Sequence, residues 1–258
     1  MEPVTFEIRD NVAFIYLNRP ERFNSFNRAM ALQLQECLDV CSTDTIVRVV
    51  YLSGNGKAFC AGQDISELTG EDPVSFDKIL SEHFNPIIRK IRALKVPVVC
   101  AVNGVAAGAG ANIALSCDVV IASASASFIQ AFSKIGLIPD SGGTYFLPRL
   151  IGFQKASALM MLGDKVTAEE AERIGMIYKV FDDNEFSEAS IHIATTLSQM
   201  PTQGLAYTKE ALNSTYTNTL EQQLSLEDKL QFKSGNTEDY REGIAAFTEK
   251  RKPVFNGK

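Results

Sequence analysis

The chain has 258 residues, of which 45% are hydrophobic and 22% are charged, and its formal net charge is −6 at pH 7. This length fits one large domain, or one domain with a small appendage, that buries a sizeable core. Nucleic-acid binding needs a basic face, so the acidic balance argues against a nucleic-acid partner. The apolar runs are far shorter than the roughly 20 residues of a membrane span, so we expect no membrane partner either.

The five cysteines show no C-x-x-C spacing, and they form no metal-ligand pattern with the two histidines, His83 and His192. Unpaired cysteines in apolar runs act as small hydrophobes and are typical of a reducing compartment. The N-terminus does not resemble a signal peptide, because no basic segment precedes an apolar one. We therefore expect a cytoplasmic protein without a metal site, in which both histidines are surface or packing residues.

The first 17 residues predict a β-hairpin, because two alternating segments flank a short Asp-Asn turn. After a loop, Ser25 is a suitable N-cap for a helix over residues 26–41. A second helix is expected over residues 74–94, directly after Pro73. Between and after these helices, apolar runs predict buried strands at residues 47–54, 96–104, 118–123 and 126–132. This alternation indicates an α/β core with short parallel strands.

From about residue 153 the pattern becomes mainly helical. Thr167 followed by Glu170 has the form of a capping box, and Gly175 ends that helix. After a short strand, helices are expected over residues 185–199, 202–214, 219–233 and 237–250. We therefore divide the chain into a core of residues 1–190 and a helical C-terminal part of residues 191–258.

Two turns built from small residues each follow a buried strand, at residues 58–64 and 106–112. Small residues let a ligand approach the backbone, and the second turn opens a helix whose first N–H groups point outward. Together the turns could hold one oxygen between two backbone N–H donors, which is an oxyanion hole. The alternative interpretation is tight packing of helix on sheet, which also selects small residues.

The apolar, glycine-rich segment of residues 135–152 contains a single acidic residue, Asp140. One interpretation is structural, because aspartate is a preferred N-cap and a helix is expected to follow it. The other is catalytic, because apolar surroundings would raise its pKa and make it a better base. A helix start would lower the same pKa, so the sequence leaves its direction open.

Four segments resemble, in order and spacing, the crotonase (enoyl-CoA hydratase/isomerase) superfamily, and residues 162–181 and 243–255 fit it too. The four segments are residues 18–27, 56–65, 96–123 and 136–152. The resemblance implies an α/β, crotonase-like spiral of ββα repeats with a helical C-terminal trimerisation part. It also implies acyl-CoA thioester substrates, homotrimers often paired into hexamers, and no metal or redox cofactor, since CoA is part of the substrate.

By this resemblance, the oxyanion donors are the backbone N–H groups of Gln63 and Ala109. The resemblance also implies a CoA site, with Phe247 and Lys250 supplied by a neighbouring subunit. Its other members are expected to be Arg22, Ala58, Ala61, Asp64 and Ile65. Tyr145, one turn beyond Asp140, is expected either to line the acyl pocket or to pack in the core.

Hydratases of the superfamily use two glutamates, and the resemblance places these at Asn112 and Phe132, neither of which is acidic. This argues against hydratase activity, because adding water needs a group to orient it and usually a second to manage the proton. Asp140 is then the acid in these motifs that is placed to move a proton. One carboxylate is chemically sufficient for an isomerase, which takes a proton from one carbon and returns it to another.

An aspartate at the Asp140 position also occurs in dienoyl-CoA isomerases, which add further acids, and in a dehalogenase branch that uses tryptophan. This chain has neither the further acids nor any tryptophan. It most resembles the ring-1,2-epoxyphenylacetyl-CoA isomerases of phenylacetate catabolism, which form oxepin-CoA and can shift an enoyl-CoA double bond. An enoyl-CoA hydratase of fatty-acid β-oxidation remains an alternative. So does a non-catalytic or RNA-binding scaffold, against which the negative charge argues.

Overall fold

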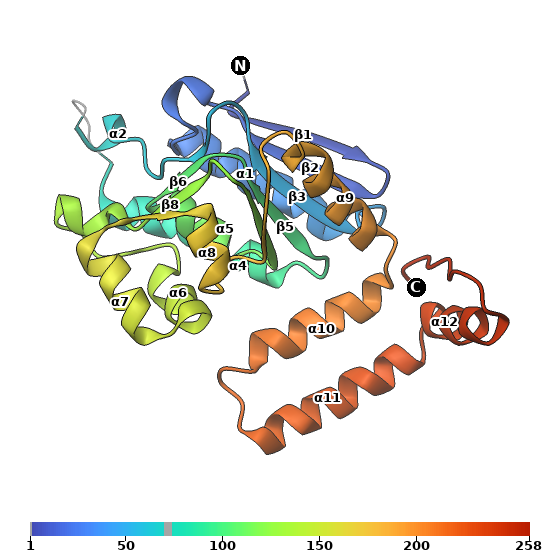
Figure 1. The fold of residues 1–258 in the computed structure, drawn as a ribbon. Coiled ribbons are helices and arrows are strands. Elements are labelled where there is room, and N and C mark those ends of the chain that lie inside the picture. Colours follow the sequence, from blue (N-terminus) through green and yellow to red (C-terminus); the bar gives the residue numbers. More distant parts are fainter. Residues whose placement is uncertain (1, 70–73) are drawn as a thin grey trace.

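A computed structural model describes residues 2–69 and 74–258 (Figure 1). The expected hairpin is confirmed, with β1 (Val4–Arg9) pairing antiparallel to β2 (Val12–Leu17). Asp10 and Asn11 connect the strands with φ angles of 52° and 65°. Two consecutive residues at positive φ give a turn whose twist matches that of the strands, which explains the Asp-Asn pair.

The larger sheet has six strands in the order β1-β2-β3-β5-β7-β10. From β2 onward each strand runs parallel to its neighbour. The later strands are β3 (Val49–Gly54), β5 (Val98–Val102), β7 (Val119–Ser123) and β10 (Lys179–Phe181). β3 and β5 are buried along their whole length, as expected for parallel strands covered on both faces.

A second sheet has four strands in the order β4-β6-β8-β9. They are β4 (Ala58–Cys60), β6 (Val105–Ala107), β8 (Ser127–Ile129) and β9 (Lys165–Thr167). Each of β3, β5 and β7 in the large sheet is followed by a strand of the small sheet and then by helices. This repetition confirms the predicted α/β class and its ββα repeats. The sequence did not predict β9, which forms one edge of the small sheet and pairs antiparallel with β8.

Helices cover both faces of the large sheet. α1 (Arg28–Thr43) and α4 (Asn85–Ala93) share the main apolar core with residues such as Leu52. α9 (Phe186–Ser198) packs on the opposite face, where it shares a second apolar cluster with residues such as Tyr51. Successive side chains of a strand point to opposite faces, so β3 contributes to both clusters.

The prediction that Ser25 caps the first helix is wrong. The N-cap is Asn27, whose side-chain oxygen accepts a hydrogen bond of 3.0 Å from the Met30 N–H. The backbone stays out of the helix until then because Phe26 forms a parallel bridge with Gln63. The first helix therefore begins two residues after the predicted start, and its entry loop is paired to the turn at Gln63.

The helix expected over residues 74–94 is not uniform. It consists of α3 (Phe76–Lys78), a π-helical segment η2 (Ile79–Phe84) and α4. The expected start signal, Pro73, lies outside the described residues. His83 in η2 is fully buried, and within residues 2–69 and 74–258 neither of its ring nitrogens has a hydrogen-bond partner. It is therefore a packing residue, whereas His192 on α9 is exposed.

Shorter helices complete the core. They are η1 (Pro20–Arg22), α2 (Ser66–Thr69), α5 (Ala109–Leu115), η3 (Ala131–Ile135), α6 (Gly143–Ile151), α7 (Phe153–Leu162) and α8 (Ala168–Arg173). Thr167 is confirmed as the N-cap of α8, because its side chain accepts from the Glu170 N–H. The Glu170 carboxylate instead pairs with Arg173, so the reciprocal half of the expected capping box is missing.

The last three helices, α10 (Thr202–Ser214), α11 (Leu220–Gly235) and α12 (Glu238–Glu249), extend away from the sheets (Figure 1). The predicted division between residues 190 and 191 falls inside α9, and residues on both sides of it pack on the large sheet. We therefore draw the boundary of the helical part after α9.

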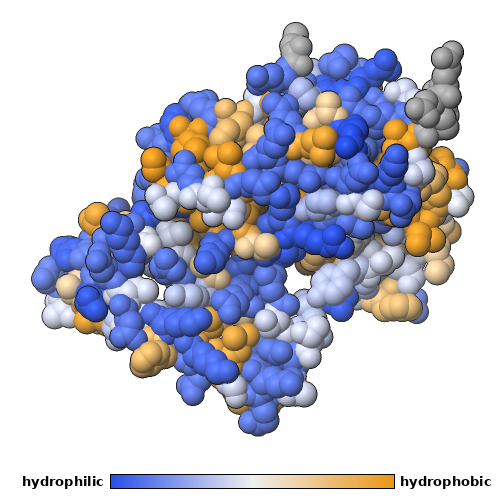
Figure 2. Space-filling view, turned by 180° about the vertical axis from the view of Figure 1, so that it is seen from behind, coloured by the Kyte–Doolittle hydropathy of each residue, from blue (hydrophilic) through white to orange (hydrophobic). Residues whose placement is uncertain are grey.

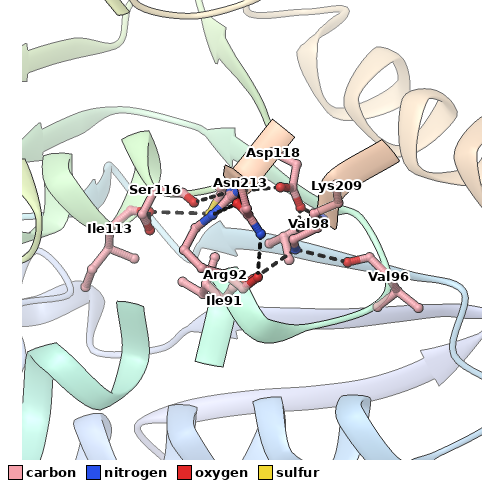
Figure 3. A network of polar contacts seen from close by, with 10 residues as sticks. Ile91, Arg92, Val96, Val98, Ile113, Ser116, Asp118, Lys209 and Asn213 are labelled. Atoms are coloured by element: carbon pink, nitrogen blue, oxygen red, sulfur yellow. Dashed lines mark hydrogen bonds and ion pairs between the residues drawn. The ribbon is translucent and has the colours of Figure 1, made fainter. Parts of the chain in front are cut away.

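A buried polar cluster, which we call the clamp, fixes α10 to the core (Figure 3). Lys209 of α10 donates to the Ile91 carbonyl at 2.9 Å, and its Nζ lies 2.7 Å from Asp118 Oδ2. Arg92 of α4 lies 2.8 Å from the other oxygen of Asp118. Burial lowers the pKa of Lys209, and Asp118 opposes that shift. Through the Asp118 carboxylate, the clamp therefore joins α10 and α4 to the segment that leads into β7.

On the face turned toward the viewer in Figure 2, apolar residues lie in separate patches among polar ones, over both the core and the helical part. Large exposed apolar side chains of the helical part include Leu212, Tyr216, Leu220, Leu224, Phe232, Tyr240, Ile244 and Phe247. Among the helices that the structure describes, none combines the length and the apolar character that a membrane crossing requires.

Candidate active site

The first of the two glycine-rich turns follows β4 and is held in place by the entry loop of α1. The Phe26 N–H donates to the Gly62 carbonyl at 2.7 Å, and the Asp64 N–H donates to the Phe26 carbonyl at 2.8 Å. In a parallel bridge of this kind the central residue, Gln63, directs its own N–H to the other side. In the described residues that N–H donates to no protein acceptor.

The second turn lies between β6 and α5. The Gly108 N–H is used by β8, donating to the Ile129 carbonyl at 2.9 Å. Gly108 has φ 54° and ψ −127°, which turns the chain sharply into α5. Ala109 is the first helical residue, so its N–H has no acceptor within the helix. Nor does it donate to any other protein group in the part of the chain that the structure describes.

Close contacts bring the two turns together. A Cβ atom on Gly62 would lie 3.0 Å from the Ala107 carbonyl oxygen and 3.5 Å from the Ala109 nitrogen. One on Gly110 would lie 2.4 Å from the carbonyl oxygen of Cys60. The small residues are therefore required for packing, as the structural interpretation holds. The same packing leaves the unsatisfied N–H groups of Gln63 and Ala109 on neighbouring turns, as an oxyanion hole requires.

Asp140 lies in the connection between η3 and α6, and the alternative interpretation, that it caps the helix, is wrong. The cap position of α6 is Gly142, and no side chain accepts from the first turn. The Asp140 carboxylate instead accepts a hydrogen bond of 2.8 Å from the Ser141 hydroxyl. Burial raises the pKa of Asp140, and the hydrogen bond from Ser141 lowers it by less. The sequence left open whether the pKa of Asp140 is raised or lowered, and in the structure it is raised.

The backbone directly after Asp140 is held in an unusual conformation. Ser141 has φ 50° and Gly142 has φ 76°, so two consecutive residues adopt left-handed geometry. This is costly for serine, whose side chain crowds the backbone there, and such strain persists only where surrounding contacts enforce it. Asp140 is thus presented on a turn that the rest of the fold must hold in place.

Asn112 and Phe132, the positions that the resemblance assigned to the glutamates of hydratases, are both buried. The Phe132 ring lies 3.7 Å from where a Cβ of Gly108 would be, so it forms an apolar wall beside the second turn. The Asn112 side chain donates to the Asp140 carbonyl oxygen at 2.9 Å and accepts from Gln130 at 2.7 Å. The sequence did not predict these bonds, although an amide buried in an apolar helix requires partners.

The segments that the resemblance assigned to CoA lie side by side. The Asn24 side chain donates to the Ala58 carbonyl at 2.8 Å, and the Ala61 N–H donates to the Phe23 carbonyl at 2.9 Å. Arg19 forms an ion pair of 2.8 Å with Asp64. These contacts join the loop that precedes α1 to the turn after β4.

The individual side chains of this expected CoA site differ in exposure. Arg22, Ala61 and Ile65 are exposed, whereas Ala58 is buried. The Asp64 carboxylate is buried and bound by Arg19 and Ser66, which together hold its pKa below the usual range against the opposing effect of burial. Asp64 therefore supports the turn through its side chain and leaves its neighbours to face a ligand.

Phe247 and Lys250 are not brought to the other expected CoA residues within one chain. Both are exposed, on α12 and at its C-terminal end. In Figure 1, α12 lies at the opposite side of the molecule from α2, which follows the Gln63 turn. The Tyr145 ring stacks on Arg149 and lines a cavity of about 390 Å³ between α10 and the core, whose described lining does not include Asp140.

Known proteins resemble the whole chain. A family model described as enoyl-CoA hydratase/isomerase matches residues 7–258. The chain is 47% identical to a 1,2-epoxyphenylacetyl-CoA isomerase of Escherichia coli (strain K12), over 100% of both sequences. It is 41% identical to a protein of Rhodobacter capsulatus named probable enoyl-CoA hydratase, over 99% of this chain and 98% of that one.

Solved structures agree with the fold. A crystal structure from Mycobacterium abscessus, described as an enoyl-CoA hydratase/isomerase, matches with a TM-score of 0.94 and 36% sequence identity. The match covers 99% of this chain and 100% of the other. The two-sheet arrangement and the helical C-terminal part described above are therefore shared with that protein.

Proposed function

Because this chain belongs to the enoyl-CoA hydratase/isomerase family, we propose that it isomerises an acyl-CoA thioester through an enolate, with Asp140 moving the proton. The observation that carries the proposal is the half-buried Asp140 carboxylate, whose pKa is raised by burial. A carboxylate with a raised pKa is a stronger base and can return the proton it has taken. The residues at the two hydratase positions, Asn112 and Phe132, carry no acid.

For a 3-enoyl-CoA, the proposed step balances without any other reactant. Asp140 takes a proton from C2, and the electron pair moves onto the thioester oxygen as an enolate. The N–H groups of Gln63 and Ala109 stabilise that oxygen, each contributing about 3 kcal/mol in the transition state. Return of the proton to C4 moves the double bond from C3–C4 to C2–C3. The reaction consumes no oxidant or reductant, so we expect it to need neither a metal nor a redox cofactor.

We propose an aromatic ring epoxide as the substrate, namely 2-(1,2-epoxy-1,2-dihydrophenyl)acetyl-CoA, which would be converted to oxepin-CoA in phenylacetate catabolism. The support is the 47% identity to the E. coli epoxyphenylacetyl-CoA isomerase, together with the lack of an acid at Asn112 and Phe132. Removal of the C2 proton would drive opening of the strained epoxide, and the product has the same formula as the substrate. A double-bond shift in a simple enoyl-CoA uses the same proton transfer.

A second candidate function is enoyl-CoA hydration, which the name of the R. capsulatus relative favours. Hydration would need a group that orients water beside the acyl chain. Asn112 could serve only if its amide were available, but both ends of that amide are hydrogen bonded inside the protein. We therefore rank hydration second.

The test is a mass-spectrometric screen of the aromatic epoxide, 3-enoyl and 2-enoyl CoA esters with the wild type and Asp140→Asn. Asp164→Asn is the matched control, since Asp164 is exposed. We expect isomerisation by the wild type and the control, and its loss in Asp140→Asn. Equal isomerisation by Asp140→Asn would refute the base assignment. Hydration of crotonyl-CoA at a rate that rivals isomerisation would favour the second candidate.

We also propose that the protein acts as a homotrimer, or as a hexamer of two trimers, in which Phe247 and Lys250 of one copy complete the CoA site of another. Phe247 is 85% exposed in the single chain, and further apolar side chains of α11 and α12 are exposed too. The double variant Phe247→Ala/Lys250→Ala should raise KM about tenfold and leave kcat unchanged, with Lys229→Ala on α11 as control. An unchanged KM would contradict this assignment.

The cytoplasm is the compartment in which we propose that the protein acts. All five cysteines are buried and unpaired. Burial raises the pKa of Cys37 to about 11 and that of Cys41 to about 12, so both stay protonated at neutral pH. This pattern fits a reducing compartment.

A further inference from the structure

We infer that Asn112 is a positioning residue that holds Asp140 in place relative to the oxyanion donors, and that Gln130 orients the Asn112 amide. This inference rests on the proposed role of Asp140 as the base. It gives a function to a position where the chain lacks the acid of hydratases.

The hydrogen bonds form a chain whose directions are fixed by chemistry. The Asp140 carbonyl oxygen can only accept, so Asn112 must turn its NH2 group toward it, at 2.9 Å. The Asn112 oxygen then faces Gln130, which must present its own NH2 group, at 2.7 Å. Asn112 is fully buried and Gln130 is 5% exposed, so water does not substitute readily for either partner. The Gln130 NH2 group thus holds the Asn112 amide in the orientation that the Asp140 carbonyl requires.

Packing allows little freedom at Asn112. A Cβ atom on Gly143 would lie 2.4 Å from Asn112 Nδ2, so the amide lies directly against the start of α6. The Gly143 N–H also donates to the Asp140 carbonyl, at 2.8 Å. That one carbonyl therefore receives two hydrogen bonds, one from the turn itself and one from α5. A glutamate at position 112, longer by one methylene, would displace the turn.

The link reaches the oxyanion hole through α5. Ala109 and Asn112 are three residues apart on the same helix, so they lie on one face, one turn from each other. The turn that they restrain contains Ser141 and Gly142 in left-handed geometry, which needs contacts to enforce it. Asn112 therefore ties the Asp140 turn to α5, the helix that also carries the Ala109 N–H donor. Misplacement of a reacting group by about 1 Å can lower the rate about 100-fold.

The experiment compares Asn112→Ala and Gln130→Ala with the wild type, through kcat, KM and the pH dependence of kcat for isomerisation. We expect kcat to fall about 10- to 100-fold in Asn112→Ala with KM changed less than threefold. The acid limb of the pH profile should move to lower pH, because a released Asp140 becomes better solvated and loses part of the effect of burial. Gln130→Ala should act in the same direction but less, and the double variant should be no worse than Asn112→Ala alone.

Asn103→Ala is the matched control, because Asn103 also bridges two backbone groups, at Gly54 and Gly56, but not at the Asp140 turn. If the inference holds, Asn103→Ala leaves the acid limb where it is in the wild type, even where it lowers the melting temperature. Two results would overturn the inference while Asp140→Asn is inactive: wild-type kcat in Asn112→Ala, or a fall in kcat without movement of the acid limb. Full activity of Asp140→Asn would instead refute the proposed function. If Asn112→Ala does not fold, the same readouts apply to Gln130→Ala.

Discussion

Asp118 in the clamp and Asp140 at the candidate site are both partly buried aspartates, but their surroundings differ. Asp118 lies 2.7 Å from Lys209 and 2.8 Å from Arg92, and it also accepts from the Val98 N–H at 2.8 Å. Asp140 accepts one side-chain hydrogen bond, from Ser141. No basic side chain of residues 2–69 and 74–258 contributes to its pKa shift. Burial alone therefore does not distinguish a catalytic carboxylate from a structural one.

The presence of a cation does distinguish them. A paired carboxylate keeps its charge and holds elements together, whereas an unpaired one is pushed toward protonation and becomes able to exchange a proton. The comparison predicts that Asp140 can be changed with loss of activity and little loss of stability. For Asp118 it predicts that a change lowers stability and leaves the activity of the folded protein nearly intact. Four experiments test this difference, from the largest expected effect to the smallest.

Asp140→Asn should lower kcat on the order of 1,000-fold, within the range that general acid–base catalysis contributes. Asparagine has the same shape and can still accept from Ser141, so the fold should persist. Steady-state kinetics combined with circular dichroism measures both properties. If Asp140→Asn lost its activity only because it unfolded, the proposed difference between Asp140 and Asp118 would be wrong.

Asp118→Asn should lower the free energy of unfolding by about 3–5 kcal/mol, since removal of one partner from a buried ion pair leaves an uncompensated charge. The charge left behind is that of Lys209, whose side chain is only 7% exposed. Urea unfolding measures the loss, and kcat per folded molecule should stay near wild type. Lys209→Met is the control and should cost less, because Asp118 then keeps Arg92. Wild-type stability of Asp118→Asn would contradict the account.

Asp64 extends the comparison to a second paired carboxylate. Asp64→Asn should lower stability by about 1.5–3 kcal/mol through loss of the charged hydrogen bond to Arg19, and should raise KM by loosening the expected CoA turn. The folded-state pKa of Asp64 is lowered, so this contribution exists above the ordinary value of 3.8 and is lost as the pH falls through the folded pKa. Chemical denaturation at several pH values measures it. A difference between wild type and variant that persisted at the lowest pH would argue against the ion pair.

The smallest expected effect is on the stability of Asp140→Asn. The folded-state pKa of Asp140 is raised, so the folded protein binds this proton more tightly than the unfolded chain. Wild-type stability therefore falls as the pH rises above the ordinary value of 3.8, and asparagine avoids that loss. The melting temperature of Asp140→Asn should be slightly higher at pH 7, and the difference should shrink toward pH 4. A lower melting temperature at pH 7 would indicate a structural carboxylate.

Much of this fold could be predicted from the sequence, because its signals are local. The Asp-Asn turn predicted the hairpin, and apolar runs of strand length predicted the parallel core. The glycines of the turns at residues 58–64 and 106–112 indicated close packing and a possible oxyanion hole. The resemblance to a family then added the repeat architecture and favoured the catalytic interpretation of Asp140.

What the sequence did not predict depends on contacts between distant residues. Asn27 replaces Ser25 as the cap because Phe26 pairs with Gln63, far along the chain. Asp140 is not a cap because its turn is held from α5 by Asn112, 28 residues away. The Asp118–Lys209 pair likewise joins segments that share no local pattern.

The most direct test of the central claim, that Asp140 is the base, is deuterium incorporation at C2 of a substrate CoA ester in D2O, followed by mass spectrometry. Wild type, Asp118→Asn and Asp164→Asn should incorporate deuterium at comparable rates per folded molecule. Asp140→Asn should show incorporation reduced on the order of 1,000-fold, since asparagine cannot take the proton. Undiminished incorporation by folded Asp140→Asn would contradict the account and assign the proton transfer to another group.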